Sequence, residues 1–190
     1  MNASFPYTPK STAHLRPGDF WDIPLEQGGF ACGRVVQIEM IKGKRNTVGF
    51  LAGLMDWFDE ELPTEKSIAG KKIVAQGEVH VKTISESEGK LRGHRSLVLD
   101  GLGPWLFRDA EYAKNILCGF FPLRRYDHDL DSDLPVIGSW GYLHIKDLAE
   151  ERFRRKRRNR VAAAIADGSP HTTVHASPHT AVQQELKILY

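Results

Sequence analysis

Alternating hydrophobic and polar positions recur along the first 150 residues and predict antiparallel β-strands. In the clearest case, residues 73–83, one face would carry Ile73, Ala75, Gly77, Val79, Val81 and Thr83, and the other face Gln76, Glu78, His80 and Lys82. A two-residue period of this kind is typical of a strand with one buried and one solvated face.

A β-hairpin is predicted upstream of that strand. Residues 20–23 are aromatic, acidic and β-branched, Pro24 can end the strand, and Gly28-Gly29 can supply the positive φ of a tight turn. Alternation then resumes in a second strand, whose inner face would carry Phe30, Cys32, Val36, Ile38 and Met40, with Arg34 as the exception. Shorter strands are predicted at 46–51, 96–99 and 136–145, with polar loops at 56–63 and 85–93.

Two helices are expected. Asp109 can cap a helix that runs through Cys118, with Gly119 as its left-handed terminator and with an apolar face formed by Ala110, Ala113, Ile116 and Leu117. Asp147 and Glu150 form an aspartate version of the capping box for a second, longer helix. We expect the first turns of that helix to pack through Leu148, Ala149 and Phe153, and its arginine-rich middle to project into water.

These elements predict an α+β fold that is predominantly antiparallel β, as a curved sheet or partly open barrel, with one packed helix and a long C-terminal helix. The length of 190 residues and the 41% hydrophobic content fit one globular domain with a tail. The predicted division is an irregular segment at 1–17, a mostly β domain at 18–146, an Arg-rich helix at 147–167, and a flexible tail at 168–190 with a short amphipathic end.

The net charge of +2 averages two unlike parts. Residues 151–190 hold eight Lys/Arg and three Asp/Glu, whereas the remainder holds 18 Lys/Arg and 21 Asp/Glu. The basic run includes Arg154, Arg155, Lys156, Arg157 and Arg158, which could neutralise phosphates in sequence-blind nucleic-acid binding. A solvated helix, or a helix docked on an acidic patch of its own fold, explains the same run.

Motifs for catalysis or metal binding are weak. The sequence lacks a nucleophile elbow, a phosphate-binding glycine loop, an HExxH motif and paired cysteines, so we expect a non-enzymatic protein without cofactors or metals. Glu78 and His80 could form an acid/base pair, but the solvated face of a strand is the simpler interpretation. The segment 127–133 fails the EF-hand template because Ser132 stands where glycine is needed. His171, His175 and His179 have helical spacing, but two nearby prolines disfavour that helix.

The two cysteines, Cys32 and Cys118, are interpreted as reduced thiols, although a disulfide between them remains an alternative. No stretch has the apolar length of a signal peptide or of a membrane span, so we expect a cytoplasmic protein with no membrane partner.

The segments Arg16-Pro-Gly-Asp-Phe-Trp-Asp-Ile-Pro-Leu25 and Gly28-Gly-Phe-Ala-Cys-Gly-Arg-Val-Val36 resemble the opening of the immunity protein 26 family of bacterial polymorphic-toxin systems. The resemblance implies a mostly β protein that is co-produced with a toxin and neutralises it by direct binding in the cytoplasm. The motif positions are interpreted as structural, and they are Gly18, Asp19, Ile23, Pro24, Leu25, Gly33 and Arg34. Gly18 and Gly33 would permit close backbone approach, and Arg34 would pair with Asp19 or Asp22.

The leading functional hypothesis is therefore a toxin inhibitor whose partner is a cognate toxin domain of unspecified type, for example a nuclease. Its acidic body could mimic nucleic acid, and the candidate partner-binding residues are Asp56, Trp57, Asp59, Glu60, Glu61, Asp127, Asp129, Asp131 and Asp133. Trp57, Phe58 and Trp105 would serve as aromatic anchors if exposed, with burial in the core as the default. The alternative hypothesis is a small β-rich module that binds nucleic acid through the Arg-rich helix.

Overall fold

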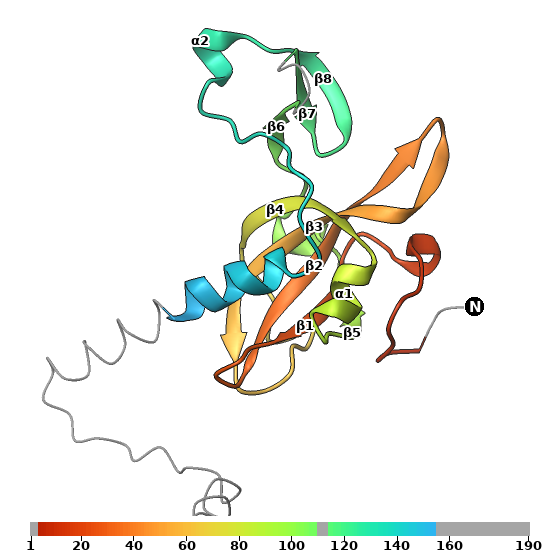
Figure 1. Ribbon diagram of the computed structural model, residues 1–190, viewed down its shortest axis with the longest axis vertical. Helices are drawn as coiled ribbons and strands as arrows, with labels where there is room; N and C mark the ends of the chain where they lie inside the picture. Colours follow the sequence, from red (N-terminus) through yellow and green to blue (C-terminus); the bar gives the residue numbers. More distant parts are fainter. Residues whose placement is uncertain (1–3, 110–113, 155–190) are drawn as a thin grey trace, which may run out of the picture. The chain divides into compact units, whose positions relative to one another are not determined.

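The computed structural model describes residues 4–109 and 114–154, which lie in one compact unit. Within these residues the strands form two antiparallel sheets (Figure 1). The larger sheet has the order β4-β3-β2-β1-β5 and consists of β1 (Asp19–Pro24), β2 (Phe30–Ile41), β3 (Lys44–Asp59), β4 (Ile73–His80) and β5 (Leu91–His94). The smaller sheet consists of β6 (Leu106–Arg108), β7 (Asn115–Cys118) and β8 (Phe121–Arg125).

The helical elements are short. They are the 3-10 turns η1 (Thr12–His14) and η2 (Val98–Asp100), the helices α1 (Lys82–Glu86) and α2 (His128–Asp131), and a further helix at 144–154. The predicted β-rich fold with antiparallel sheets is confirmed, and the sheets do not close into a barrel. The remainder of the predicted long C-terminal helix, residues 155–167, and the tail at 168–190 lie outside the described residues.

The predicted β1–β2 hairpin is confirmed, and its turn has Gly28 at φ 83° and Gly29 at φ 80°. The predicted inner face of β2 is wrong beyond Val36. Cys32 and Val36 pack in one hydrophobic cluster, but Ile38 packs in the other. The reason is a register shift against β3 between Val35 and Gln37, since a bulge inverts the alternation of all later positions.

The strand β3 is longer than predicted and extends through Asp56 and Trp57, which the pattern had assigned to a loop. The strand β4 ends earlier than predicted. Val81 occupies the N-cap position of α1, and Thr83 is a buried residue of that helix. Gln76 was expected on the solvated face, yet it is buried, and its amide binds the backbone of Gly103 and Trp105.

The predicted helix at 109–118 is wrong in its described part, because residues 115–118 form β7. Gly119 does adopt a left-handed φ of 57°, but in the turn between β7 and β8. A short apolar run such as Ile116-Leu117 fits either a strand or a helix face, and the sequence offers too few residues to decide. Residues 110–113 lie outside the described residues.

Two further predicted strands are wrong. Residues 96–99 lead into η2, and residues 136–145 make only isolated bridges at Val136 and Ser139. The last helix begins near residue 144 instead of Asp147, whose amide already bonds to the Leu143 carbonyl. Gly138 and Gly141 weaken a strand in this segment. The segment can therefore turn into a helix before Asp147.

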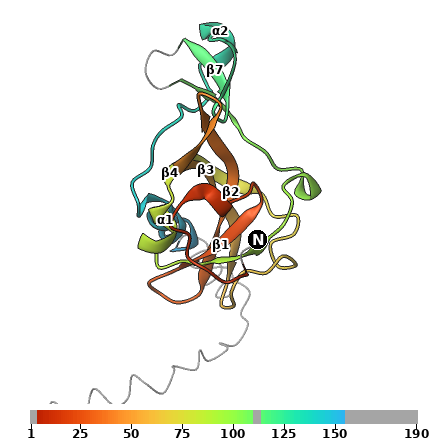
Figure 2. The ribbon, with the colours of Figure 1, turned by 90° about the vertical axis from the view of Figure 1, so that its right-hand side faces the viewer.

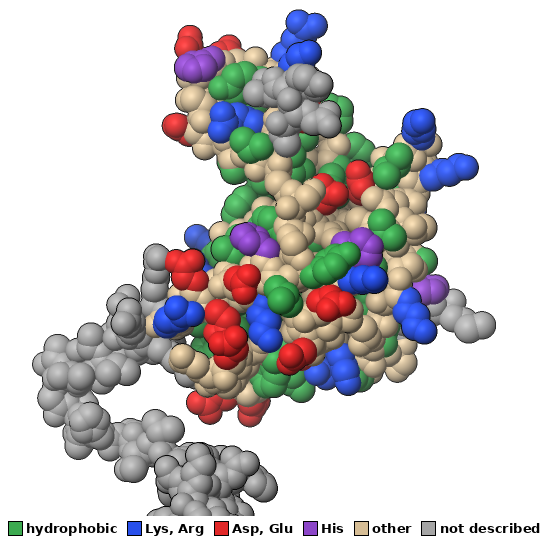
Figure 3. Space-filling view, viewed as in Figure 1, with side chains coloured by type: hydrophobic (Ala, Val, Ile, Leu, Met, Phe, Trp, Pro, Cys, Tyr) green, Lys and Arg blue, Asp and Glu red, His purple; other side chains and the backbone are tan. Residues whose placement is uncertain are grey.

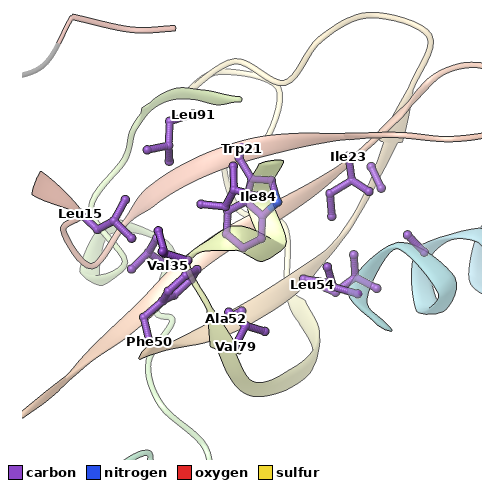
Figure 4. Close-up of a cluster of buried hydrophobic side chains, with 14 of the residues drawn as sticks. Leu15, Trp21, Ile23, Val35, Phe50, Ala52, Leu54, Val79, Ile84 and Leu91 are labelled. Atoms are coloured by element: carbon purple, nitrogen blue, oxygen red, sulfur yellow. The ribbon is translucent and has the colours of Figure 1, made fainter. Parts of the chain in front are cut away.

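The larger sheet is buried on both faces. Trp21 and Phe20 are neighbours on β1 and point to opposite sides, into two separate clusters. Figure 2 shows α1 and the helix at 144–154 on one side of the sheet and the η2 turn on the other. The first cluster, shown in Figure 4, includes Leu15, Trp21, Ile23, Val35, Phe50, Leu54, Val79, Ile84 and Leu91.

The helix at 144–154 belongs to this core. Ile145, Ala149 and Phe153, spaced by four residues, are fully or almost fully buried in the first cluster. The expected packing of Ala149 and Phe153 is confirmed, and this spacing places all three on one helix face. In the N-terminal segment, Thr12 and Leu15 are also buried. No helix within the described ranges has the length and apolar character needed to cross a membrane.

Candidate partner-binding surfaces

Asp19 and Asp22, the acidic side chains of the motif segments 16–25 and 28–36, are buried and paired within the chain. Asp19 lies 2.8 Å from His94 Nδ1 and also accepts a hydrogen bond from the Arg16 amide. Asp22 binds the Arg92 guanidinium at 2.7 Å and 3.1 Å. These contacts tie β1 to β5 and to the segment that precedes β1, so both carboxylates have structural roles.

Arg34 is fully buried and pairs with Asp100, Nη1 to Oδ2, at 2.9 Å. Its other terminal nitrogen donates to the carbonyls of Arg95 and Ser96. The predicted pairing of Arg34 with Asp19 or Asp22 is therefore wrong. The sequence could not show that the segment 95–100 folds over this face of β2 and delivers a different carboxylate.

Asp100 is the centre of this buried network. It also binds the Arg95 guanidinium at 2.8–3.0 Å and accepts a hydrogen bond from the Gly70 amide at 3.0 Å. The Arg95 hydrogen bond, helped by Gly70 and Arg34, holds the pKa of Asp100 well below its usual range. The network thus fixes the loop at 96–101 on one face of the sheet.

This loop presents two aliphatic side chains to solvent, and sequence reasoning missed them. Val98 is 85% exposed and Leu99 is 73% exposed, while their neighbours Leu97 and Asp100 are buried. We name residues 96–101 the aliphatic loop. The available signal was the Asp100-Gly101 dipeptide, which is typical of a turn and argues against a strand at 96–99. Gly101 indeed has a positive φ of 63°.

The predicted acidic residues at 56–61 do not behave alike. Asp56 pairs with Arg152 at 3.2 Å, and Asp59 accepts hydrogen bonds from the amides of Glu60 and Glu61. Trp57 is only 4% exposed and lies in the second cluster, so its ring is part of the core and offers no anchor. The other two proposed anchors, Phe58 and Trp105, are partly buried against the two clusters, and Phe58 stacks on Phe153 with ring centroids 4.8 Å apart.

Two further carboxylates join this region. The Glu150 side chain accepts a hydrogen bond from the Glu26 amide at 2.6 Å, which places the last helix beside the β1–β2 turn. That turn lies next to the end of β3, where Phe30 pairs with Asp59. We name this set the β3 acidic surface, and it consists of Glu26, Asp59, Glu60, Glu61 and Glu150. Figure 3 shows acidic side chains around the last helix and at the adjacent end of the sheet.

The second predicted acidic segment, 127–133, lies in a different part of the fold. Asp127 caps α2, and Asp131 is buried in a bidentate ion pair with Arg124 that lowers the pKa of Asp131. Of the four aspartates in this segment, Asp127, Asp129 and Asp133 are exposed. The segment follows β8 of the smaller sheet, whereas residues 56–61 end β3 of the larger sheet.

The remaining candidate chemistry is dispersed. Within the described ranges, no three His, Cys, Asp or Glu side chains lie close enough together to hold a metal ion. Glu78 binds the Ser139 hydroxyl at 2.9 Å, and His80 Nδ1 accepts a hydrogen bond from the Lys82 amide. Both cysteines are free thiols, and burial raises the pKa of Cys32 far above its usual value. The candidate metal-binding histidines 171, 175 and 179 lie outside the described residues.

Arg154 is the one residue of the candidate nucleic-acid site that lies within the described residues. Arg152 is paired with Asp56, and Arg154 is exposed. The other four candidates, Arg155, Lys156, Arg157 and Arg158, lie outside the described residues.

The described residues thus define a β-rich protein with a buried charged network, an exposed aliphatic loop and two separate acidic surfaces. Comparisons of the chain with protein-family models, with curated proteins and with solved structures found no match. The resemblance of residues 16–36 to the immunity protein 26 family therefore stays a hypothesis from the sequence.

Proposed function

We propose that this protein is an immunity protein that binds a cognate polymorphic toxin in the cytoplasm and neutralises it. The resemblance of residues 16–36 suggests this function. The structural observation that supports the proposal is that the charged residues fall into two groups, those paired inside the fold and those exposed to solvent. The charged motif side chains Asp19, Asp22 and Arg34 are consumed by internal pairs, whereas Glu60 and Glu61 are exposed and make no side-chain ion pair within the described residues.

The residues of such a motif stabilise the fold. Partner recognition would then depend on residues outside the motif. An inhibitor that must find its toxin quickly gains from surface charge, because complementary charge accelerates diffusional encounter and disfavours wrong partners. The β3 acidic surface supports a basic partner, such as the nucleic-acid-binding cleft of a nuclease. The exposed Val98 and Leu99 add apolar surface that a protein partner could cover.

The test is a growth-rescue and binding experiment with the toxin domain encoded next to this chain's gene. Co-expression of the chain should restore the growth of cells that produce the toxin, and the purified pair should form a complex. Charge reversal by Glu60→Lys and Glu61→Lys should slow association at least tenfold at low salt, because it removes the electrostatic attraction.

The matched control is Asp129→Lys with Asp133→Lys, which reverses two exposed carboxylates on the other acidic surface. Equal losses in both double variants would show that net charge alone matters and that the β3 acidic surface is not the binding site. A gene neighbourhood without a toxin, or a toxin whose activity the chain leaves unchanged, would reject the immunity function itself.

The second candidate function, nucleic-acid binding, rests on the exposure of Arg154 where the basic run begins. Neutralisation of Arg154, Arg155, Lys156, Arg157 and Arg158 should then abolish a salt-sensitive mobility shift of generic DNA or RNA. A shift that survives neutralisation, or no shift for the unaltered protein at low salt, would reject this candidate.

A further inference from the structure

The hairpin of β2 and β3 extends beyond the strands on either side of it. The strand β1 pairs with β2 at residues 30–34, and β4 pairs with β3 at residues 49–55, whereas β2 and β3 pair with each other as far as Ile41 and Lys44. The end of the hairpin, residues 39–46, is therefore a two-stranded ribbon with no further strand of the described residues beside it (Figure 1).

The turn of this ribbon holds a lysine at a position that does not favour one. Lys42 has a φ of 49° and Gly43 a φ of 75°. A two-residue hairpin turn with positive φ at both positions favours Asn, Asp and Gly, because other side chains cost energy there. The backbone of the turn thus gives no reason for a lysine. Lys42 is exposed, so a role of its charge in binding explains the residue.

The N-terminal segment brings further basic residues to the ribbon. The Arg45 guanidinium donates to the Leu15 carbonyl at 2.6 Å and 3.3 Å, and the Thr12 hydroxyl donates to the Asn46 carbonyl. These bonds hold η1 against the ribbon, and the exposed Lys10 lies two residues before η1. We name this set the hairpin basic surface, and it consists of Lys10, Lys42, Lys44 and Arg45.

The charge of the hairpin basic surface is not balanced by carboxylates. Lys10, Lys42 and Lys44 are exposed and make no ion pair within the described residues. The one acidic residue of the ribbon, Glu39, accepts a hydrogen bond from the Asn46 side-chain amide. Figure 3 shows Lys and Arg side chains at the end of the ribbon, whereas acidic side chains lie around the last helix. A surface of one sign attracts a ligand of the opposite sign.

The composition of this surface favours the phosphates of nucleic acid over other anionic partners. Lysine is depleted in protein–protein interfaces, whereas Lys and Arg are the residues that neutralise phosphates. Segments that insert at a membrane surface carry aromatic side chains, and residues 39–46 contain none. A two-stranded ribbon also has dimensions that the major groove of B-form DNA admits.

We propose that the hairpin basic surface binds duplex DNA, with the ribbon in the major groove and its lysines on the phosphates at the groove edges. Met40 and Ile41, which are 49% and 51% exposed, lie beside these lysines and provide apolar contact to base edges such as the thymine methyl group. Binding through phosphates weakens steeply with salt. This site is separate from the basic run at 154–158, and the proposal does not rest on the proposed toxin.

Fluorescence anisotropy with a labelled DNA duplex of arbitrary sequence tests the proposal. The protein is the full chain with the basic run at 154–158 neutralised, so that the run does not contribute. The logarithm of the association constant falls with the logarithm of the salt concentration, by about 0.9 for each neutralised phosphate. Lys42→Gln with Lys44→Gln should therefore reduce this slope by about two and weaken binding at least about tenfold at low salt.

The matched control is Lys71→Gln with Lys72→Gln. It removes the same charge from two exposed lysines at the opposite end of β3, where the Asp56 amide donates to the Lys72 carbonyl. The control should leave the slope and the affinity unchanged. Equal losses in the two double variants would overturn the proposal, because they would show that net charge alone governs binding.

The proposal would also be overturned if the chain with the neutralised run did not bind the duplex at low salt. Binding to vesicles of phosphatidylglycerol and phosphatidylcholine without binding to the duplex would assign the surface to a membrane instead. Circular dichroism checks that the variants are folded. If the hairpin variant unfolds, Lys10→Gln is the second test, since Lys10 lies outside the hairpin. It should reduce the slope by about one, and an unchanged slope would reject the site.

Discussion

Gly33 lies opposite Trp21 on the neighbouring strand, and the indole ring occupies the space where a Cβ would stand. A Cβ at Gly33 would lie 2.1 Å from the ring. Arg34 follows directly and sends its guanidinium into the buried network with Asp100. Gly33 makes room for the Trp21 ring, and Arg34 holds the aliphatic loop against the sheet. These two roles explain why both residues belong to the motif.

We predict that Gly33→Ala destabilises the protein by about 3 kcal/mol, because the added methyl forces the indole or the strand to move in a close-packed core. Chemical denaturation should show a lower midpoint with an unchanged slope. Gly103→Ala is the control, since nothing lies within 4 Å of a Cβ built there and no positive φ is involved. A midpoint shift of similar size in both variants would contradict the steric explanation.

The buried network predicts a specific pH dependence of stability. Because the pKa of Asp100 is lower in the folded state than in the unfolded chain, its ionised form stabilises the fold above about pH 4, and this contribution declines as the pH falls. Asp100→Asn should lower the free energy of unfolding at pH 7 and should flatten its decline between neutral and acidic pH. Urea denaturation at pH 7 and near pH 3.5 measures both effects.

An equal pH dependence in the Asp100→Asn variant and the unaltered protein would show that other carboxylates govern acid stability. Asp129→Asn is the matched control for the loss of one carboxylate, since Asp129 is exposed and its carboxylate lies 3.6 Å from the similarly accessible ring of His128. It should leave the pH dependence unchanged.

At the scale of elements, the helix at 144–154 closes one face of the larger sheet through a single row of side chains. Phe153 is 3% exposed and stacks on Phe58 of β3, and Arg152 pairs with Asp56 of the same strand. The helix begins in a segment that sequence patterns assigned to a strand. Its packing therefore depends on three-dimensional contacts that alternation could not reveal.

We predict that Phe153→Ala lowers the free energy of unfolding by about 3 kcal/mol or more, through lost burial and the cavity that remains. Thermal and denaturant unfolding measure this loss. Arg154→Ala, at the exposed position next to it, should change stability by less than about 0.5 kcal/mol. Comparable losses in the two variants would contradict the packing explanation, because alanine is the strongest helix former and cannot weaken the helix through its propensity.

The hairpin of β1 and β2 and the strand β4 could be predicted because their patterns were long and ended in turn residues such as Gly28-Gly29. The errors fall where the pattern was short or interrupted. Bulges in β2 invert the alternation after Val35, and the four-residue strand β7 resembles a helix face. For the candidate site, the exposed acidic residues were visible in the sequence, but the aliphatic loop depends on a long-range pair, Arg34 with Asp100, that no local pattern contains.

At the scale of the whole molecule, the two thiols differ in their exposure to solvent, so their reactivities measure different opening motions of the protein. Cys32 lies at 0% exposure between the larger sheet and the loops that cover it, and burial raises the pKa of its thiol. Cys118, on β7, is partly exposed. Because only a thiolate reacts rapidly, Cys32 is protected both by exclusion of the reagent and by its protonation.

We predict that the native protein at low concentration reacts with one equivalent of a thiol reagent, at Cys118, and that the second equivalent follows only global unfolding. The Cys32 labelling rate should therefore equal the unfolding rate when unfolded protein is trapped faster than it refolds. Rapid reaction of both thiols in the native state would show that the core around Cys32 opens locally.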